Sequence, residues 1–192
     1  MIERIADRIV ESLILSHTIE IEDVSVYQYG FEIMLSTIVS ILIALILGIA
    51  LHCVAAATAF LTMFIILRSV GGGYHAPTYL QCNLLFAFVT AVVLLSYKFV
   101  PIAQFTVLHY SILFFSIIVA IAYAPVENAN KPLSIVQKKY GRFLSVALTV
   151  LLALLSCLLE ILILSPYSIL IDMTVLVVSV SMYVTDTTRG GE

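Results

Sequence analysis

Charged residues are scarce in this sequence. Asp, Glu, Lys and Arg make up 11% of its 192 residues, whereas a soluble domain usually carries roughly 25%. Hydrophobic residues make up 62%, which is more apolar surface than a soluble fold of this length can hide. The net charge of -3 comes without a basic run, and this pattern excludes a nucleic-acid partner. The sequence therefore predicts a protein embedded in a lipid bilayer.

Cysteines are also few, and they lack the paired spacing of a zinc site. They are three in number: Cys53, Cys82 and Cys157. An odd number argues against a disulfide framework. A secretory signal is not expected, because Glu3, Asp7 and Glu11 precede the first long apolar block. We expect no metal and no cofactor.

Apolar blocks long enough to cross a bilayer fill most of the chain. Such a crossing takes about 20 residues as a helix. The blocks lie at roughly 31–51, 53–67, 83–101, 102–124, 143–164 and 167–184. The alternating pattern of a membrane barrel is absent, and helices satisfy their own backbone hydrogen bonds in lipid. The predicted fold class is all-α, a polytopic membrane protein with about six transmembrane helices.

The N-terminus has a different pattern. Apolar residues recur at helical spacing from Ile2 to Ile14, with charged residues on the other face. This predicts an amphipathic helix that lies on lipid, on the protein's own helices or on an incoming peptide. A polar, acidic linker is expected from Ser16 to Gly30. The predicted division is residues 1–30 as an interfacial segment, 31–185 as a membrane-embedded domain and 186–192 as a short cytoplasmic tail.

The positive-inside rule orients the predicted helices. With both termini in the cytoplasm, eight of the nine Lys and Arg residues lie inside and only Lys98 lies outside. This predicts a multi-pass protein of a bacterial cell membrane. Glu160 and Asp172 then flank an outer turn at Ser165 and Pro166, where we expect ordinary interfacial positions rather than a proton relay.

One predicted cytoplasmic loop, residues 68–83 (RSVGGGYHAPTYLQCN), concentrates glycine, proline and polar residues. Its glycines accept positive φ and let a substrate backbone approach closely. Pro77 fits the first turn of the next helix, so that Cys82 falls in its second turn and His75 just before it. A helix N-terminus and a nearby imidazolium both favour a thiolate, so this spacing indicates an activated nucleophile beside a base. The alternative is a polar boundary histidine near a small core cysteine.

A second polar stretch, from Val126 to Arg142, is rich in positive charge. Its basic residues are Lys131, Lys138, Lys139 and Arg142. They either set the topology or dock an acidic peptide tail, and both roles are compatible.

These two stretches resemble the accessory gene regulator B (AgrB) family of bacterial membrane endopeptidases, which process quorum-sensing propeptides. Arg68, the glycines up to Gly73, His75 and Cys82 resemble the family signature. Residues 123–134, YAPVENANKPLS, resemble the loop between its fourth and fifth helices. The order of the membrane blocks extends the resemblance over nearly the whole chain.

The resemblance implies that Cys82 is the nucleophile and His75 the general base. It implies a propeptide with an amphipathic leader, a central signal segment and an acidic tail. Cleavage before the tail leaves a thioester on Cys82, and a Cys or Ser of the substrate then closes a thiolactone or lactone ring. The resemblance also suggests a homodimer.

The remaining site residues are weaker predictions. Substrate contacts or oxyanion donors are expected among these four: Gly72, Gly73, Arg68 and Gln81. No carboxylate within the motif orients His75, so the candidates for that role are Gln81, Ser69, Tyr74 and Glu127. A non-enzymatic peptide exporter or assembly factor is the alternative function, and it predicts that Cys82 is dispensable.

Overall fold

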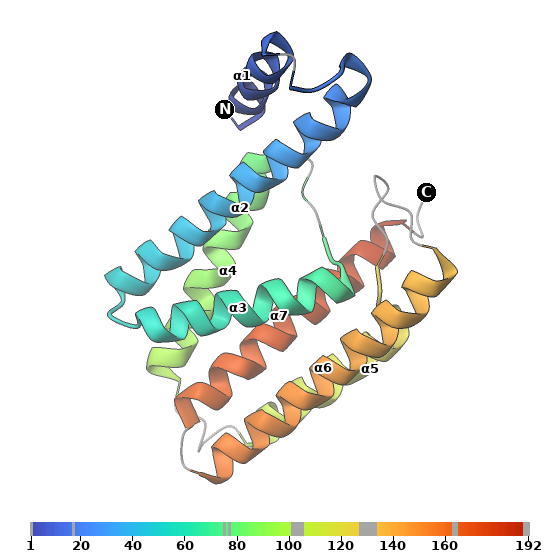
Figure 1. Cartoon of the computed structure of the whole chain (residues 1–192). Helices are drawn as coiled ribbons and strands as arrows, with labels where there is room; N and C mark the ends of the chain where they lie inside the picture. The colour runs from blue at the N-terminus through green and yellow to red at the C-terminus, as the bar shows by residue number, and fades with distance from the viewer. Residues whose placement is uncertain are drawn as a thin grey trace.

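The computed structural model describes residues 2–16, 18–74, 76, 78–100, 106–126, 134–162 and 165–189. Seven α-helices and one 3-10 turn occupy these residues, with no β-strand among them (Figure 1). The helices are α1 (Ile2–Leu15), α2 (Val24–Ala50), α3 (Val54–Gly71), α4 (Tyr79–Phe99), α5 (Thr106–Tyr123), α6 (Ile135–Ile161) and α7 (Ser165–Arg189), and the 3-10 turn is Ile21–Asp23. The predicted all-α class is confirmed.

Six of these helices, α2 to α7, are long and apolar enough to cross a bilayer. The shortest expected block, at 53–67, becomes α3, an 18-residue helix that continues to Gly71. At 1.5 Å per residue α3 spans about 27 Å, close to the roughly 30 Å hydrocarbon core of a bilayer. The predicted number of crossings is confirmed.

Three helices begin elsewhere than the apolar pattern predicted. α2 begins at Val24, within the expected linker, and α4 begins at Tyr79 rather than near 83. α6 begins at Ile135 rather than near 143, because Ser134 forms a capping box with Gln137. The Ser134 hydroxyl accepts from the Gln137 N–H at 3.3 Å, and the Gln137 side chain accepts from the Ser134 N–H at 2.9 Å. Caps of this kind start a helix in polar sequence, where hydrophobic blocks give no signal.

α7 lies at the centre of the bundle and contacts α3, α4, α5 and α6. Its buried side chains include Leu170, Val175, Val178 and Met182. α1 packs on α2, and its buried residues are Ala6 and Val10. The sequence left open whether this amphipathic helix lies on lipid, on the protein's own helices or on a peptide. In the structure it packs on α2.

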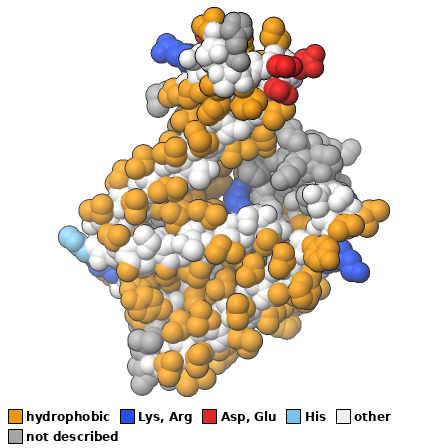
Figure 2. Space-filling model, viewed as in Figure 1, with side chains coloured by type: hydrophobic (Ala, Val, Ile, Leu, Met, Phe, Trp, Pro, Cys, Tyr) orange, Lys and Arg blue, Asp and Glu red, His pale blue; other side chains and the backbone are white. Residues whose placement is uncertain are grey.

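The two ends of the bundle differ. The connections α3–α4 and α5–α6 lie at the end that also carries α1, which we call the loop end; the connections α2–α3 and α6–α7 lie at the opposite, far end (Figure 1). Figure 2 shows hydrophobic side chains over the flank of the bundle, with acidic side chains gathered near α1 and the turn before α2. This distribution suits a flank in lipid and a loop end in water.

Candidate active site

Cys82 lies in the first turn of α4, at the loop end, and its thiol is half-buried. The sequence predicted the second turn. The difference arises because Thr78 caps the helix: its hydroxyl accepts from the Gln81 N–H at 3.3 Å, and its carbonyl accepts from the Cys82 N–H at 3.0 Å. Cys82 is therefore closer than expected to the positive end of the helix dipole. His75 and Pro77 lie outside the described residues.

Arg68, in the last turn of α3, faces this helix start. Its guanidinium donates a hydrogen bond to the Tyr74 carbonyl and lies 5.6 Å from the centre of the Phe64 ring. The Arg68 charge also interacts electrostatically with Cys82. Arg68 therefore fixes the chain at the residue before His75 and brings a positive charge to the predicted nucleophile.

The glycines between α3 and α4 are required by geometry. Gly72 has φ 75° and Gly73 has φ 145°, values that residues with a side chain rarely adopt. A Cβ on Gly72 would overlap the Val126 carbonyl, and a Cβ on Gly73 would lie 2.6 Å from the Ser181 hydroxyl. The helix ends here, since the Gly72 N–H bonds to the Arg68 carbonyl at 3.0 Å.

The two stretches singled out in the sequence meet at this point. The Val126 N–H donates to the Gly71 carbonyl at 2.9 Å, so the segment after α5 pairs with the end of α3. α6 packs closely against the same segment, because a Cβ on Gly141 would lie 3.1 Å from the ring of Pro125. Residues 71–73 and 124–126 thus form one folded unit at the end of α3.

The candidates for orienting His75 stay predictions. Ser69 donates its hydroxyl to the Ile66 carbonyl at 2.8 Å, and the Tyr74 carbonyl accepts from Arg68. Gln81 is exposed, and Glu127 lies outside the described residues.

A large groove runs along α6 from the loop end. Its volume is about 1210 Å³, and its walls include the end of α5, Lys138, Lys139 and Asp186. Arg142, on the same wall, donates to the Ile121 carbonyl at 2.7 Å and to the Ala122 carbonyl at 3.3 Å. Arg142 therefore binds the last carbonyls of α5, a role that basic residues commonly take at helix ends and that the sequence did not predict. Lys131 lies outside the described residues.

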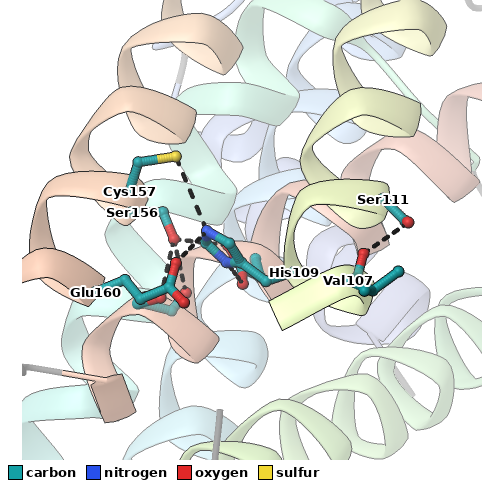
Figure 3. A network of polar contacts seen from close by, with 8 residues as sticks. Val107, His109, Ser111, Ser156, Cys157 and Glu160 are labelled. Carbon is teal, nitrogen blue, oxygen red and sulfur yellow. Dashed lines mark hydrogen bonds and ion pairs between the residues drawn. The ribbon is translucent and has the colours of Figure 1, made fainter. Parts of the chain in front are cut away.

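A buried polar cluster at the far end contradicts the expected interfacial position of Asp172. Asp172 is 2% exposed, and its carboxylate lies 2.6 Å from Nδ1 of the buried His109. Glu160 lies 3.0 Å from Nε2 of the same imidazole, and Ser156 donates to Asp172 at 2.6 Å. Figure 3 shows His109 of α5 pointing toward Ser156 and Glu160. Asp172 is buried because α5, α6 and α7 converge there.

This cluster contains a second cysteine–histidine pair. The Cys157 sulfur lies 3.8 Å from His109 Nε2 (Figure 3). That nitrogen faces Glu160 at the shorter distance of 3.0 Å, and two adjacent carboxylates disfavour a thiolate. Cys157 is therefore a poor nucleophile.

Cys53 is unsuited for a different reason. It lies in the turn between α2 and α3, where burial raises the pKa of its thiol and Lys98 lowers it by a smaller amount. Among the three cysteines, Cys82 is the one in the first turn of a helix that follows the glycine-rich segment along the chain.

Comparison with known proteins matches nearly the whole chain to one family. A family described as "Accessory gene regulator B" matches residues 2–183. The chain is similar to "Putative AgrB-like protein 2" of Clostridium perfringens (strain 13 / Type A), with 29% identity over 144 residues, which cover 72% of this chain and 67% of the relative. It is also similar to "Putative AgrB-like protein" of Clostridium perfringens (strain SM101 / Type A), with 27% identity and the same coverage. No solved structure matches the chain.

Proposed function

This chain belongs to the accessory gene regulator B family, and from that premise we propose that it is a membrane-embedded cysteine endopeptidase that processes a quorum-sensing propeptide. Family membership supports a role in the agr quorum-sensing system. The cysteine endopeptidase assignment rests on the position of Cys82, which lies in the first turn of α4 and within electrostatic reach of Arg68.

This position suits a nucleophile. A cysteine thiol needs a base within reach to become the reactive thiolate. His75, seven residues earlier in the chain, is the base of the proposed dyad. Arg68 holds the carbonyl of Tyr74, the residue directly before His75 in the chain.

The proposed reaction has two acyl transfers. The Cys82 sulfur attacks the carbonyl carbon before the acidic tail, His75 takes the thiol proton, and that proton passes to the amine of the departing tail as the C–N bond breaks. The result is a thioester on Cys82. A Cys or Ser of the substrate then attacks the thioester, the bond to the Cys82 sulfur breaks, and the ring closes as the thiol is re-formed. A site partly within the bilayer favours this outcome because it keeps water from the thioester.

Backbone N–H groups are the proposed donors to the oxyanion. The Gly72 N–H is already bonded to the Arg68 carbonyl, and the Gln81 N–H to the Thr78 hydroxyl. The better candidates are the Gly73 N–H and the first N–H groups of α4, because the start of a helix offers donors that lack acceptors within the helix.

The groove along α6 is the proposed dock for the acidic tail of the propeptide. Lys138 and Lys139 line it near the folded unit of residues 71–73 and 124–126. Arg142 contributes by holding the end of α5, which forms part of the same wall.

The test is to replace the dyad and follow tail release from a co-expressed candidate propeptide with an amphipathic leader and an acidic tail. Cys82→Ala and His75→Ala are each expected to abolish cleavage while membrane insertion is retained. Cys53→Ala and Cys157→Ala are the matched controls and are expected to cleave normally. Normal cleavage by Cys82→Ala would reject the peptidase and favour the exporter.

A further inference from the structure

Two hydrogen bonds join α2 to the start of α4 and flank Cys82. The Tyr79 hydroxyl donates to Glu32 Oε2 at 2.8 Å, and the Ser36 hydroxyl donates to Asn83 Oδ1 at 3.3 Å. Glu32 and Ser36 are four residues apart on α2, and Tyr79 and Asn83 are four residues apart on α4. The two contacts, which we call the two rungs, therefore lie about one helical turn apart. Cys82 lies between the two rungs in sequence.

The rungs fix the rotation of α4 as well as its position. Tyr79 and Asn83 face α2, and Cys82 is offset from Tyr79 by about 60° around the helix axis at 3.6 residues per turn. The other side of this turn is open, since Leu80, Gln81 and Leu84 are exposed. Contacts with α2 therefore fix the face of α4 on which Cys82 lies.

The Glu32 carboxylate also accepts a hydrogen bond from within α2. Gln28 donates to Glu32 Oε1 at 3.5 Å and to Asp7 of α1 at 2.9 Å. A polar chain thus runs from Asp7 through Gln28 and Glu32 to Tyr79. Polar contacts of this kind specify one arrangement of helices, whereas apolar packing tolerates several.

We propose that Glu32 and Tyr79 are positioning residues that set the orientation of the Cys82 thiol, through a hydrogen bond between α2 and the first residue of α4. This inference rests on the proposed function, because it takes Cys82 as the nucleophile. Neither side chain is assigned a contact with the substrate. Their loss should therefore reduce kcat and leave KM unchanged.

The experiment measures kcat and KM for tail release from a candidate propeptide by the full-length protein in membranes. Tyr79→Phe keeps the ring and removes the hydroxyl, and a hydrogen bond to a charged group is strong enough to predict a fall in kcat of about tenfold, with KM within about twofold. Glu32→Ala should fall equally, and Glu32→Gln, which keeps an acceptor, should stay within about twofold of wild type. The double variant Glu32→Ala/Tyr79→Phe should be no worse than Glu32→Ala alone, because both substitutions remove the same Tyr79–Glu32 hydrogen bond. Tyr27→Phe, at an exposed tyrosine of α2, is the matched control.

Failure of this proposal is distinguishable from failure of the peptidase assignment. If Cys82→Ala is inactive and Tyr79→Phe has the kcat of wild type, the positioning role alone is rejected. A rise in KM at constant kcat, or losses that add in the double variant, would also reject it. If Cys82→Ala cleaves the propeptide, both proposals fall together.

Discussion

His109 lies between two carboxylates, with Nδ1 2.6 Å from Asp172 and Nε2 3.0 Å from Glu160. The imidazole and the Asp172 side chain are buried, and Glu160 is partly exposed. Charges in such places are expensive, and removal of one partner leaves the others uncompensated.

His109→Ala is therefore expected to destabilise the protein by about 3–5 kcal/mol, since it leaves Asp172 and Glu160 without the imidazole that both contact. The measurement is thermal unfolding in detergent. His52→Asn is the control, because His52 lies in an exposed turn with φ 54° that asparagine tolerates. An unchanged melting temperature for His109→Ala would show that the cluster contributes no net stability.

Sequence reasoning missed this cluster for a physical reason. His109 and Asp172 are 63 residues apart, and spacing within a helix indicates which residues share a face but not which helix that face meets. The available signal was the presence of ionisable residues inside apolar blocks, which by default marks a functional or structural site.

At the scale of helices and their connections, the glycine-rich turn is closely constrained by its positive φ values and its neighbours. Gly72→Ala is expected to impair both folding and cleavage, because it forces a Cβ into positive φ and into the Val126 carbonyl. Gly30→Ala is the matched control: it lies within α2 with no atom near its would-be Cβ, and alanine should stabilise the helix by about 0.5–1 kcal/mol. Melting temperature and tail release distinguish the two. A Gly72→Ala protein as stable and active as wild type would contradict the described turn.

The basic wall of the α6 groove yields a kinetic prediction. Lys138→Gln/Lys139→Gln should raise the KM for the propeptide by about fivefold, on the basis of two partly exposed ion pairs, with kcat nearly constant because the contacts are remote from the reacting bond. The effect should shrink as salt increases. Arg142→Gln is expected instead to lower stability, since Arg142 holds the end of α5. A KM that does not change in Lys138→Gln/Lys139→Gln would leave topology as the role of these lysines.

The helices were predictable in number and order but less so in extent. Hydrophobic blocks mark the lipid-facing length of a helix, whereas its ends are set by caps such as Thr78 and Ser134. Lys138, Lys139 and Arg142 were for this reason expected in a loop, although they lie on α6. The sequence also placed Cys82 in the second turn of α4 rather than the first, because the hydrophobic pattern does not reveal the Thr78 cap.

At the scale of the whole molecule, six helices are long and apolar enough to cross a membrane, and six crossings predict that the two ends of the chain lie on the same side. The excess of Lys and Arg predicts that this side is the cytoplasm. In a cysteine-free variant, single cysteines at position 130 or directly after Arg189 should react with an impermeant maleimide only in opened cells. One at Ser165 should react in intact cells. The reverse pattern at either location would discard this topology.

The candidate site was only partly predictable. The sequence placed Arg68, the glycines and Cys82 in one segment, and the structure adds the bond from Arg68 to the Tyr74 carbonyl and the bond from Val126 to Gly71. The contacts from Glu32 and Ser36 to α4 were not predictable, because they join helices 47 residues apart and depend on how α2 packs against α4.

The most direct test of the account is to locate the acyl-enzyme. Wild-type protein is co-expressed with a candidate propeptide, quenched at low pH to preserve thioesters, and analysed by mass spectrometry for a hydroxylamine-sensitive adduct. The account predicts a released tail and an adduct, with the mass of the remaining propeptide, on Cys82. An adduct on Cys157 or Cys53, or tail release by Cys82→Ala, would contradict it.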